Sequence, residues 1–243
     1  MTDAELAREL ASAAGELLLN IQRDLALSGK ALGAAGDIAA NSLLVERLQQ
    51  ERPSDALLSE EEKDDRARCE MARVWIIDPL DGTREYGERR EDWAVHVALA
   101  INGAPVAGAV AMPARGEVYC TARPTHLPAA AATPRMVVSR SRPAVEALAV
   151  AEAIGAELIP MGSAGAKTMA VVRGDAEIYL HSGGQYEWDS CAPVAVALAH
   201  GLHASRLDGS PLVYNCSDLY MPDLLICRHE WAEPIIALLR RAS

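Results

Sequence analysis

Phenylalanine is absent from this chain of 243 residues, and its five cysteines include no C-x-x-C pair. An odd number of cysteines without paired spacing argues against a disulfide framework and against a zinc site built from thiolates. No apolar run approaches the ~20 residues needed to span a bilayer, and the N-terminus shows no signal-peptide pattern. We therefore expect a cytoplasmic protein with reduced cysteines and no membrane partner.

Basic residues are also scarce, with 23 Lys and Arg against 34 Asp and Glu, which gives a net charge of −11. This balance argues against a partner that is a nucleic-acid polymer, because such binding needs a basic surface. It leaves room for a small anionic substrate, provided that a bound metal reverses the local field. The histidines show no metal-ligand spacing, so we interpret His96 and the others as structural or surface residues. No G-x-S-x-G motif indicates a serine hydrolase.

Helical and strand patterns alternate along the chain. Thr2 and Glu5 form a predicted capping box before a first amphipathic helix, and a second helix is predicted from Ile38 to Leu48, after a glycine-rich connection through residues 29–36. Residues 92–122 predict an antiparallel sheet with a hairpin turn at 102–103. In the second half of the chain the pattern predicts strands that are followed by helices, which favours layered α/β packing.

We expect two closely packed halves, 1–134 and 135–243, because a Pro/Ala-rich stretch over residues 123–134 suits a connection. The first half would be α+β and the second α/β. Within the second half, residues 182–185 (Ser-Gly-Gly-Gln) are expected to form a flexible loop. No internal repeat is evident.

The stretch Trp75–Thr83 (Trp-Ile-Ile-Asp-Pro-Leu-Asp-Gly-Thr) carries the strongest chemical signal. Its apolar start predicts a buried strand that stops at Asp78-Pro79, since proline cannot donate to a sheet ladder. Asp78 and Asp81 would then converge at a strand end, as oxygen ligands for a hard cation such as Mg²⁺ do. A plain turn, in which both acids cap local N–H groups, is the alternative for this motif alone.

Further acids occur at the ends of other predicted elements. Glu60 follows a short strand over residues 56–58, Asp37 precedes the second helix, and Asp189 opens a later one after Trp188. Each has a simpler interpretation, as part of a solvated loop or as a helix cap. If the strands are neighbours, however, Glu60 comes close to Asp78 and Asp81.

Residues 162–167 (Gly-Ser-Ala-Gly-Ala-Lys) follow a predicted strand and open a helix, as a phosphate-binding loop does. Ala166 replaces the glycine that a Walker A motif needs before its lysine, which weakens that interpretation. The backbone N–H groups and Ser163 still offer hydrogen bonds to an anion.

Taken together, Glu60-Glu61, the Asp78–Thr83 stretch and Trp188-Asp189 resemble, in this order, the signature of the inositol monophosphatase superfamily. Residues 81–86, 93–99, 162–167 and 203–215 are most similar to its CysQ branch. The resemblance covers nearly the whole chain. It implies an αβαβα sandwich, commonly dimeric, and a phosphatase that depends on Mg²⁺ and is inhibited by Li⁺. CysQ-type enzymes remove the 3′-phosphate of 3′-phosphoadenosine 5′-phosphate, a by-product of sulfate assimilation.

The resemblance also implies a set of metal ligands. Glu60, Asp78 and the Leu80 carbonyl would hold a first ion. Asp78, Asp81 and Asp189 would hold a second, and Glu60 would help to bind a weaker third. Two such ions, about 3.5–4 Å apart, generate a nucleophilic hydroxide and stabilise the leaving oxygen without a covalent intermediate.

The catalytic residues implied beside the metals are Asp37 and Thr83, with Glu60 contributing as a shared ligand. Asp37, paired with the Thr83 hydroxyl, would orient the attacking water, and the N–H groups of Gly82 and Thr83 would receive the phosphate. The expected substrate-binding residues are Asp81, Gly82, Thr83, Ser163, Lys167, Glu187 and Arg206. Residues 86–92 and 206–214 are the regions expected to distinguish an adenine site from a polyol site, with Arg206 as a candidate for a second phosphate.

Two alternatives stay open at this stage. The same chemistry could act on an inositol phosphate or on fructose 1,6-bisphosphate, or on both kinds of substrate, because the side chains that read the rest of the substrate cannot be placed from the sequence. A non-catalytic sensing module would have lost at least one ligand or the Asp37–Thr83 pair, and all are present. A small phosphate ester is therefore the expected partner.

Overall fold

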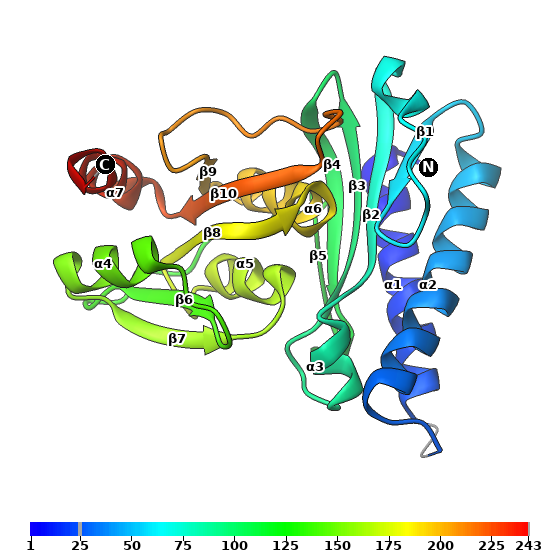
Figure 1. Ribbon diagram of the computed structural model, residues 1–243, viewed down its shortest axis with the longest axis horizontal. Coiled ribbons are helices and arrows are strands. Elements are labelled where there is room, and N and C mark those ends of the chain that lie inside the picture. Colours follow the sequence, from blue (N-terminus) through cyan, green and yellow to red (C-terminus); the bar gives the residue numbers. More distant parts are fainter. Residues whose placement is uncertain (24–25, 243) are drawn as a thin grey trace.

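The computed structural model describes residues 1–23 and 26–242, which fold into alternating helix and sheet layers (Figure 1). One outer layer holds α1 (Asp3–Gln22) and α2 (Gly29–Glu51), which cover the first sheet. Between the two sheets lie α5 (Ala164–Arg173) and α6 (Glu187–Ala199). The other outer layer holds α4 (Val145–Ile154) and α7 (His229–Ala242) on the second sheet. The predicted αβαβα sandwich is confirmed.

Each sheet has five strands and mixes parallel with antiparallel neighbours. The first has the order β1 (Ala56–Ser59), β2 (Arg73–Asp81), β3 (Ala94–Ile101), β4 (Ala104–Met112) and β5 (Glu117–Cys120). In this sheet β1 and β2 are parallel, and the other neighbouring strands are antiparallel. The second has the order β7 (Glu157–Met161), β6 (Arg135–Ser139), β8 (Ile178–Tyr186), β10 (Tyr220–Cys227) and β9 (His203–Ser205). Strand β6 runs parallel to both β7 and β8.

Three apolar clusters fill the spaces between the layers. Along β2, Trp75 and Ile77 pack towards α1 and α2, whereas Val74 and Ile76 pack towards α5 and α6. Both faces of this strand are therefore buried, as its unbroken apolar run predicts. Burying each such side chain contributes about 1.5–3 kcal/mol, so β2 is anchored on both sides. The third cluster lies between the second sheet and α4 and α7.

Helix α2 begins at Gly29, so the predicted glycine-rich connection over residues 29–36 is wrong. Glycine is a poor helix former, but at these positions neighbouring side chains leave no space for a Cβ atom. A Cβ atom on Gly33 would lie 2.6 Å from Thr83 Cγ2, and one on Gly36 would lie 2.9 Å from the Tyr86 ring. The glycines thus let α2 approach the short helix α3 (Thr83–Gly87).

Two strands are longer than predicted. Strand β2 continues through Pro79 to Asp81, with a register shift against β3 between Asp78 and Asp81 that accommodates the proline. Residues 182–185 are not a loop, because Ser182 and Gln185 pair with Asp223 and Met221 of β10, with a register shift at Gly183 and Gly184, and β8 continues to Tyr186. Gly183 and Gly184 both have φ of +72° in this strand. The partner strand lies far along the chain and gives no local signal.

Two local predictions, the capping box and the hairpin turn, are confirmed. Thr2 and Glu5 form the capping box of α1, and residues 102–103 form the turn between β3 and β4. Residues 123–134 contain neither helix nor strand. A search of the described residues finds no helix whose length and apolar character would let it cross a membrane.

Candidate active site

Three aspartates meet where β2 ends and α6 begins. The side chains of Asp78, Asp81 and Asp189 each bring a carboxylate oxygen into a group whose atoms lie within 4.8 Å of one another. Asp78 and Asp81 are buried, and Asp189 occupies the first turn of α6, where it accepts the Tyr186 N–H at 2.7 Å. The predicted convergence of acids from separate motifs is therefore present.

Glu60 joins this group because of the parallel register of β1 and β2. Ser59 lies opposite Ile77, so the next residue on each strand brings Glu60 beside Asp78. Burial, followed by the charge of Glu60, raises the pKa of Asp78, as expected for two neighbouring carboxyls. Asp78 Oδ1 also accepts the Leu80 N–H at 3.0 Å, which fixes the orientation of its carboxyl.

Asp37 reaches the site from α2. Its Oδ1 atom lies 3.4 Å from the Thr83 hydroxyl, which also lies 3.2 Å from the Leu80 carbonyl oxygen. The close packing of Gly33 against Thr83 brings α2 near enough for this contact. The expected pairing of Asp37 with Thr83 is thus seen in the geometry, although its role stays a prediction.

Burial and mutual repulsion disfavour the ionised form of most acids in this group. Burial, followed by the charge of Glu61, raises the pKa of Asp37 to about 7. Burial is also the main cause that raises the pKa values of Glu60 and Asp189 to about 7, with neighbouring acids adding to it. Burial and the charges of Glu60, Asp81 and Asp189 raise the pKa of Asp78 well above its usual value. A cation would relieve this cost, and an all-oxygen donor set suits a hard divalent ion.

Asp81 differs from its neighbours because it has donors of its own. Its carboxylate accepts the N–H groups of Gly165 at 2.6 Å and Ala164 at 3.2 Å, at the start of α5. Burial alone would raise the pKa of Asp81, but the charge of His96, these N–H groups and Lys167 outweigh burial and lower it. Asp81 therefore stays ionised, and it ties β2 to α5.

His96 is a site residue that the sequence did not identify. Its Nε2 atom lies 3.1 Å from Asp81 Oδ2, and its Nδ1 atom lies 3.1 Å from the Trp188 carbonyl oxygen. A Cβ atom on Gly165 would lie 2.2 Å from His96 Nε2, so only glycine fits there. A signal existed, because His96 is the polar residue of an otherwise apolar strand that pairs with β2.

Ser163 and Lys167 sit at the start of α5, beside Asp81. The Ser163 hydroxyl accepts the Ala166 N–H at 2.9 Å and so caps the helix. Lys167 is buried, and its Nζ atom donates to the carbonyl oxygens of Gly162 and Ser163 while lying 5.3 Å from the centre of the Tyr179 ring. Burial lowers the pKa of Lys167 to about 8, against the pull of Asp81. The substrate contacts of Ser163 and Lys167 stay predictions.

The other predicted substrate residues have different partners. Glu187 is buried, and its two carboxylate oxygens accept the N–H groups of Asn215 and Cys216, each at 2.7 Å. Arg206 forms a two-pronged ion pair with Asp223 at 2.7 Å, on a turn that packs against α7. Tyr214 is buried and shares a hydrogen bond with Ser190 at 3.2 Å. None of these contacts joins the acidic group.

A cavity of about 530 Å³ opens beside Asp37 and Thr83. Residues from α2 and α3 line it, including Lys30, Arg84 and Glu88. Its size is in the range of small-molecule sites.

Comparison with known proteins gives consistent results. Residues 2–243 match the sequence profile of the inositol monophosphatase family. A 3′-phosphoadenosine 5′-phosphate phosphatase from Mycobacterium leprae is 51% identical over 255 residues, covering 99% of this chain and 94% of the relative. The 3′(2′),5′-bisphosphate nucleotidase CysQ of Escherichia coli is 30% identical, over 77% of this chain and 81% of its own. The crystal structure of CysQ from Bacteroides thetaiotaomicron superimposes with a TM-score of 0.81 at 28% identity, covering 93% of this chain and 97% of that one.

Proposed function

The chain belongs to the inositol monophosphatase family, and from that premise we propose that its acidic centre hydrolyses the 3′-phosphate of 3′-phosphoadenosine 5′-phosphate to give AMP. The observation that carries the proposal is the meeting of the Asp78, Asp81 and Asp189 carboxylates, which interact with Glu60 and lie next to the Asp37–Thr83 pair. The choice of substrate rests on the 51% identical relative of that name. The reaction would clear the by-product of sulfate assimilation.

The family is generally metal-dependent, and the acidic group fits a hard divalent cation. We propose Mg²⁺, two or three ions per site, held by Glu60, Asp78, Asp81, Asp189 and the Leu80 carbonyl, with Li⁺ as an inhibitor. When bound, the ions would supply an activated water and would neutralise charge on the phosphate.

The protein's own groups would then position the reactants. Asp37 and the Thr83 hydroxyl, 3.4 Å apart, would orient the water and take up its proton. The raised pKa of Asp37, about 7, suits a group that must accept a proton near neutral pH. The backbone N–H groups of Gly82 and Thr83 would hold the phosphate oxygens. No covalent intermediate is needed for this transfer.

We also propose a cytoplasmic setting and a homodimer. The five free cysteines support the first, because disulfides are rare in that compartment. The homodimer is expected from the family, in which paired subunits are common.

The decisive assay compares phosphate release, with Mg²⁺, from four substrates: 3′-phosphoadenosine 5′-phosphate, inositol 1-phosphate, fructose 1,6-bisphosphate and AMP. Each is tested with and without Li⁺. We expect the highest kcat/KM for the bisphosphate nucleotide. Comparable rates on inositol phosphate would indicate a broad phosphatase, and no Mg²⁺-dependent release from any substrate would refute the catalytic proposal.

A further inference from the structure

His96 is fully buried next to the acidic group, on a strand that carries none of the acids. It lies on β3 directly opposite Asp78 of β2, so the side chains of this pair point to the same face of the sheet. Along a regular strand, residues three apart such as Asp78 and Asp81 point to opposite faces. The register shift between them interrupts this alternation, and Asp81 comes to the face on which His96 lies.

The imidazole ring of His96 joins Asp81 to the start of α6. Its Nε2 atom lies 3.1 Å from Asp81 Oδ2, and this contact is close although it is not aligned as a regular hydrogen bond. Its Nδ1 atom lies 3.1 Å from the Trp188 carbonyl oxygen, which can only accept, so Nδ1 is the donor there. One ring therefore spans the two segments that carry Asp81 and Asp189.

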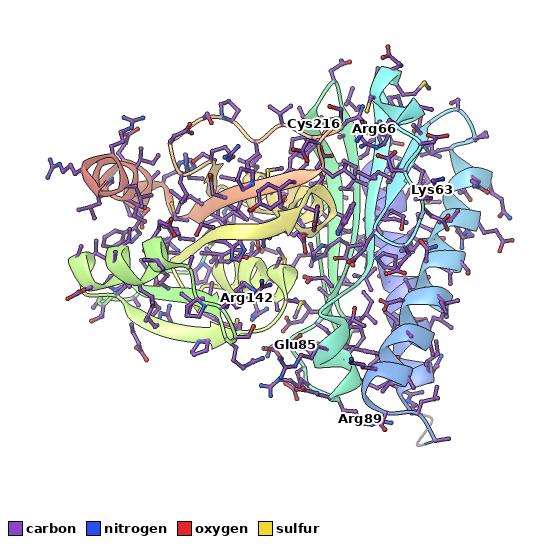
Figure 2. All side chains as sticks on the ribbon, viewed as in Figure 1. Lys63, Arg66, Glu85, Arg89, Arg142 and Cys216 are labelled. Carbon is purple, nitrogen blue, oxygen red and sulfur yellow. The ribbon has the colours of Figure 1, made fainter. Side chains whose placement is uncertain are left out.

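Helix α5 packs against the same contact. The Gly165 N–H donates to Asp81 Oδ2 at 2.6 Å, so a single carboxylate oxygen contacts both the α5 backbone and the His96 ring. A Cβ atom on Gly165 would lie 2.2 Å from His96 Nε2, which shows that the ring lies directly on this backbone. Side chains fill the layer between the first sheet and the helices α5 and α6 (Figure 2). The ring is thus fixed by packing as well as by contacts at both nitrogens.

The far end of the ring bears on the position of Asp189. This residue follows Trp188 directly in the first turn of α6, and its carboxylate accepts the Tyr186 N–H at 2.7 Å. Fixing the Trp188 carbonyl therefore fixes the backbone that carries Asp189. Asp81 and Asp189 belong to different halves of the chain, so the spacing of their carboxylates depends on how α6 packs on the first sheet. Groups that hold ligating carboxylates in place govern the affinity for a metal.

We infer that His96 is a positioning residue, which sets the spacing of Asp81 and Asp189 for a divalent cation by contacting the Asp81 carboxylate and the Trp188 carbonyl with one ring. This inference rests on the proposed function, because that function assigns both aspartates to the metal. In this role His96 touches neither the substrate nor the reacting atoms. Its loss should therefore change the affinity for Mg²⁺ more than the affinity for the substrate.

Amide variants separate the two ends of the ring. In His96→Asn the side-chain amide can replace Nδ1 and keep the Trp188 contact, whereas in His96→Gln it can replace Nε2 and keep the Asp81 contact. His96→Leu removes both contacts. His200→Leu is the matched control, because His200 is also buried and its Nδ1 atom also donates to a carbonyl oxygen, that of Val196, at the opposite end of α6 from Asp189.

Calorimetric titration with Mg²⁺ in the absence of substrate measures the affinity for the ion, and thermal melts of the metal-free proteins measure stability. We expect His96→Leu to bind Mg²⁺ about 10- to 100-fold more weakly, and the Mg²⁺ concentration that gives half-maximal phosphate release to rise by the same factor. The KM for 3′-phosphoadenosine 5′-phosphate at saturating Mg²⁺ should stay near the wild-type value. The Asn and Gln variants should each show a smaller loss of Mg²⁺ affinity, and His200→Leu should show none.

A His96→Leu protein with a lower Tm and unchanged Mg²⁺ affinity would refute the positioning role, and so would an equal loss of affinity in His200→Leu. If His96→Leu does not fold, wild-type Mg²⁺ affinity in both amide variants would refute it equally. A wild type that binds Mg²⁺ but releases phosphate from no substrate would overturn the proposed function, while the calorimetric comparison would still decide the role of His96. A wild type that binds no Mg²⁺ would overturn both.

Discussion

Asp78 and Asp81 stand three residues apart on one strand, yet their pKa values shift in opposite directions. Both are buried, so burial does not distinguish them. Asp81 has His96 and two backbone N–H groups as partners, whereas the carboxyl of Asp78 faces those of Glu60 and Asp189. Asp78 is thus the acid of this group whose negative charge is least compensated by the protein.

Replacing Asp78 with Asn should separate stability from catalysis. Asn can still accept the Leu80 N–H and carries no charge to repel Glu60, so the metal-free variant should keep or raise its Tm. Turnover should fall by about 10³-fold or more, as when a key electrostatic group is lost. Added Mg²⁺ should raise the Tm of the wild type but not that of the variant, because only a protein that binds the ion is stabilised.

Asp55→Asn is the matched control, since Asp55 pairs with Arg73 and the Trp75 indole away from the acidic group. It should lower Tm and leave turnover near the wild-type value. Thermal melts and steady-state assays on both variants check this pattern. A collapsed fold in Asp78→Asn, or full activity, would contradict the assigned role.

At the residue scale, the sequence predicted the acids better than the groups around them. The sequence pattern identified four acids, because each lies near the predicted start or end of a helix or strand: Glu60, Asp78, Asp81 and Asp189. His96 gave only a weak signal, as a polar residue in an apolar strand, because its contact with Asp81 depends on the register shift between β2 and β3. The position of Arg206 depends on a salt bridge to Asp223, which no local pattern reveals.

At the level of single elements, the errors have a common cause. Helix α2 was predicted too short and β8 ended too early, in both cases where glycines occur. Local propensity predicts that glycine interrupts a helix or strand. In α2, however, glycine allows close contact with α3. In β8, glycine occupies positions with positive φ, next to a partner strand that is distant in the sequence. The confirmed capping box and hairpin depend only on neighbours in sequence.

Glu177 gives a pH-dependent prediction for the start of β8. Burial raises its pKa, but the Arg135 guanidinium and the N–H groups of Ala131 and Arg135 outweigh burial and lower it. The folded pKa is therefore below the unfolded one, so this contribution to stability is complete above about pH 4.5 and is lost as the pH falls through the folded value.

Glu177→Gln should accordingly lower the free energy of unfolding by about 1–3 kcal/mol at pH 7. The difference from wild type should shrink as the pH falls below 4.5, and urea unfolding at several pH values measures it. Glu152→Gln, on an exposed position of α4, should show little difference at any pH. A constant difference for Glu177→Gln down to pH 3 would argue against the ionic contribution.

For the whole molecule, the cluster between the sheets joins the two halves. It contains Val74 and Ile76 from the first half together with Tyr179 and Leu224 from the second. Neither half would cover this face alone. The division at residues 134 and 135, proposed from composition, therefore separates two sheets and not two independent cores.

We expect a single cooperative unfolding transition. Calorimetry should give a van't Hoff enthalpy close to the calorimetric one, and far-UV circular dichroism should follow the same curve as tryptophan fluorescence. Residues 1–134 and 135–243 expressed separately should each fail to fold. Two resolved transitions, or a stable isolated half, would show that the halves are independent domains.

The acidic centre draws its carboxylates from both halves, with Asp189 far along the chain from Glu60. During synthesis, a ribosome makes Glu60, Asp78 and Asp81 long before it reaches α6 and Asp189. A chain terminated before α6 therefore lacks Asp189, and one terminated before α5 also lacks the N–H donors that hold Asp81. Premature termination upstream of α6 would therefore yield inactive fragments, never a partly active phosphatase with relaxed specificity.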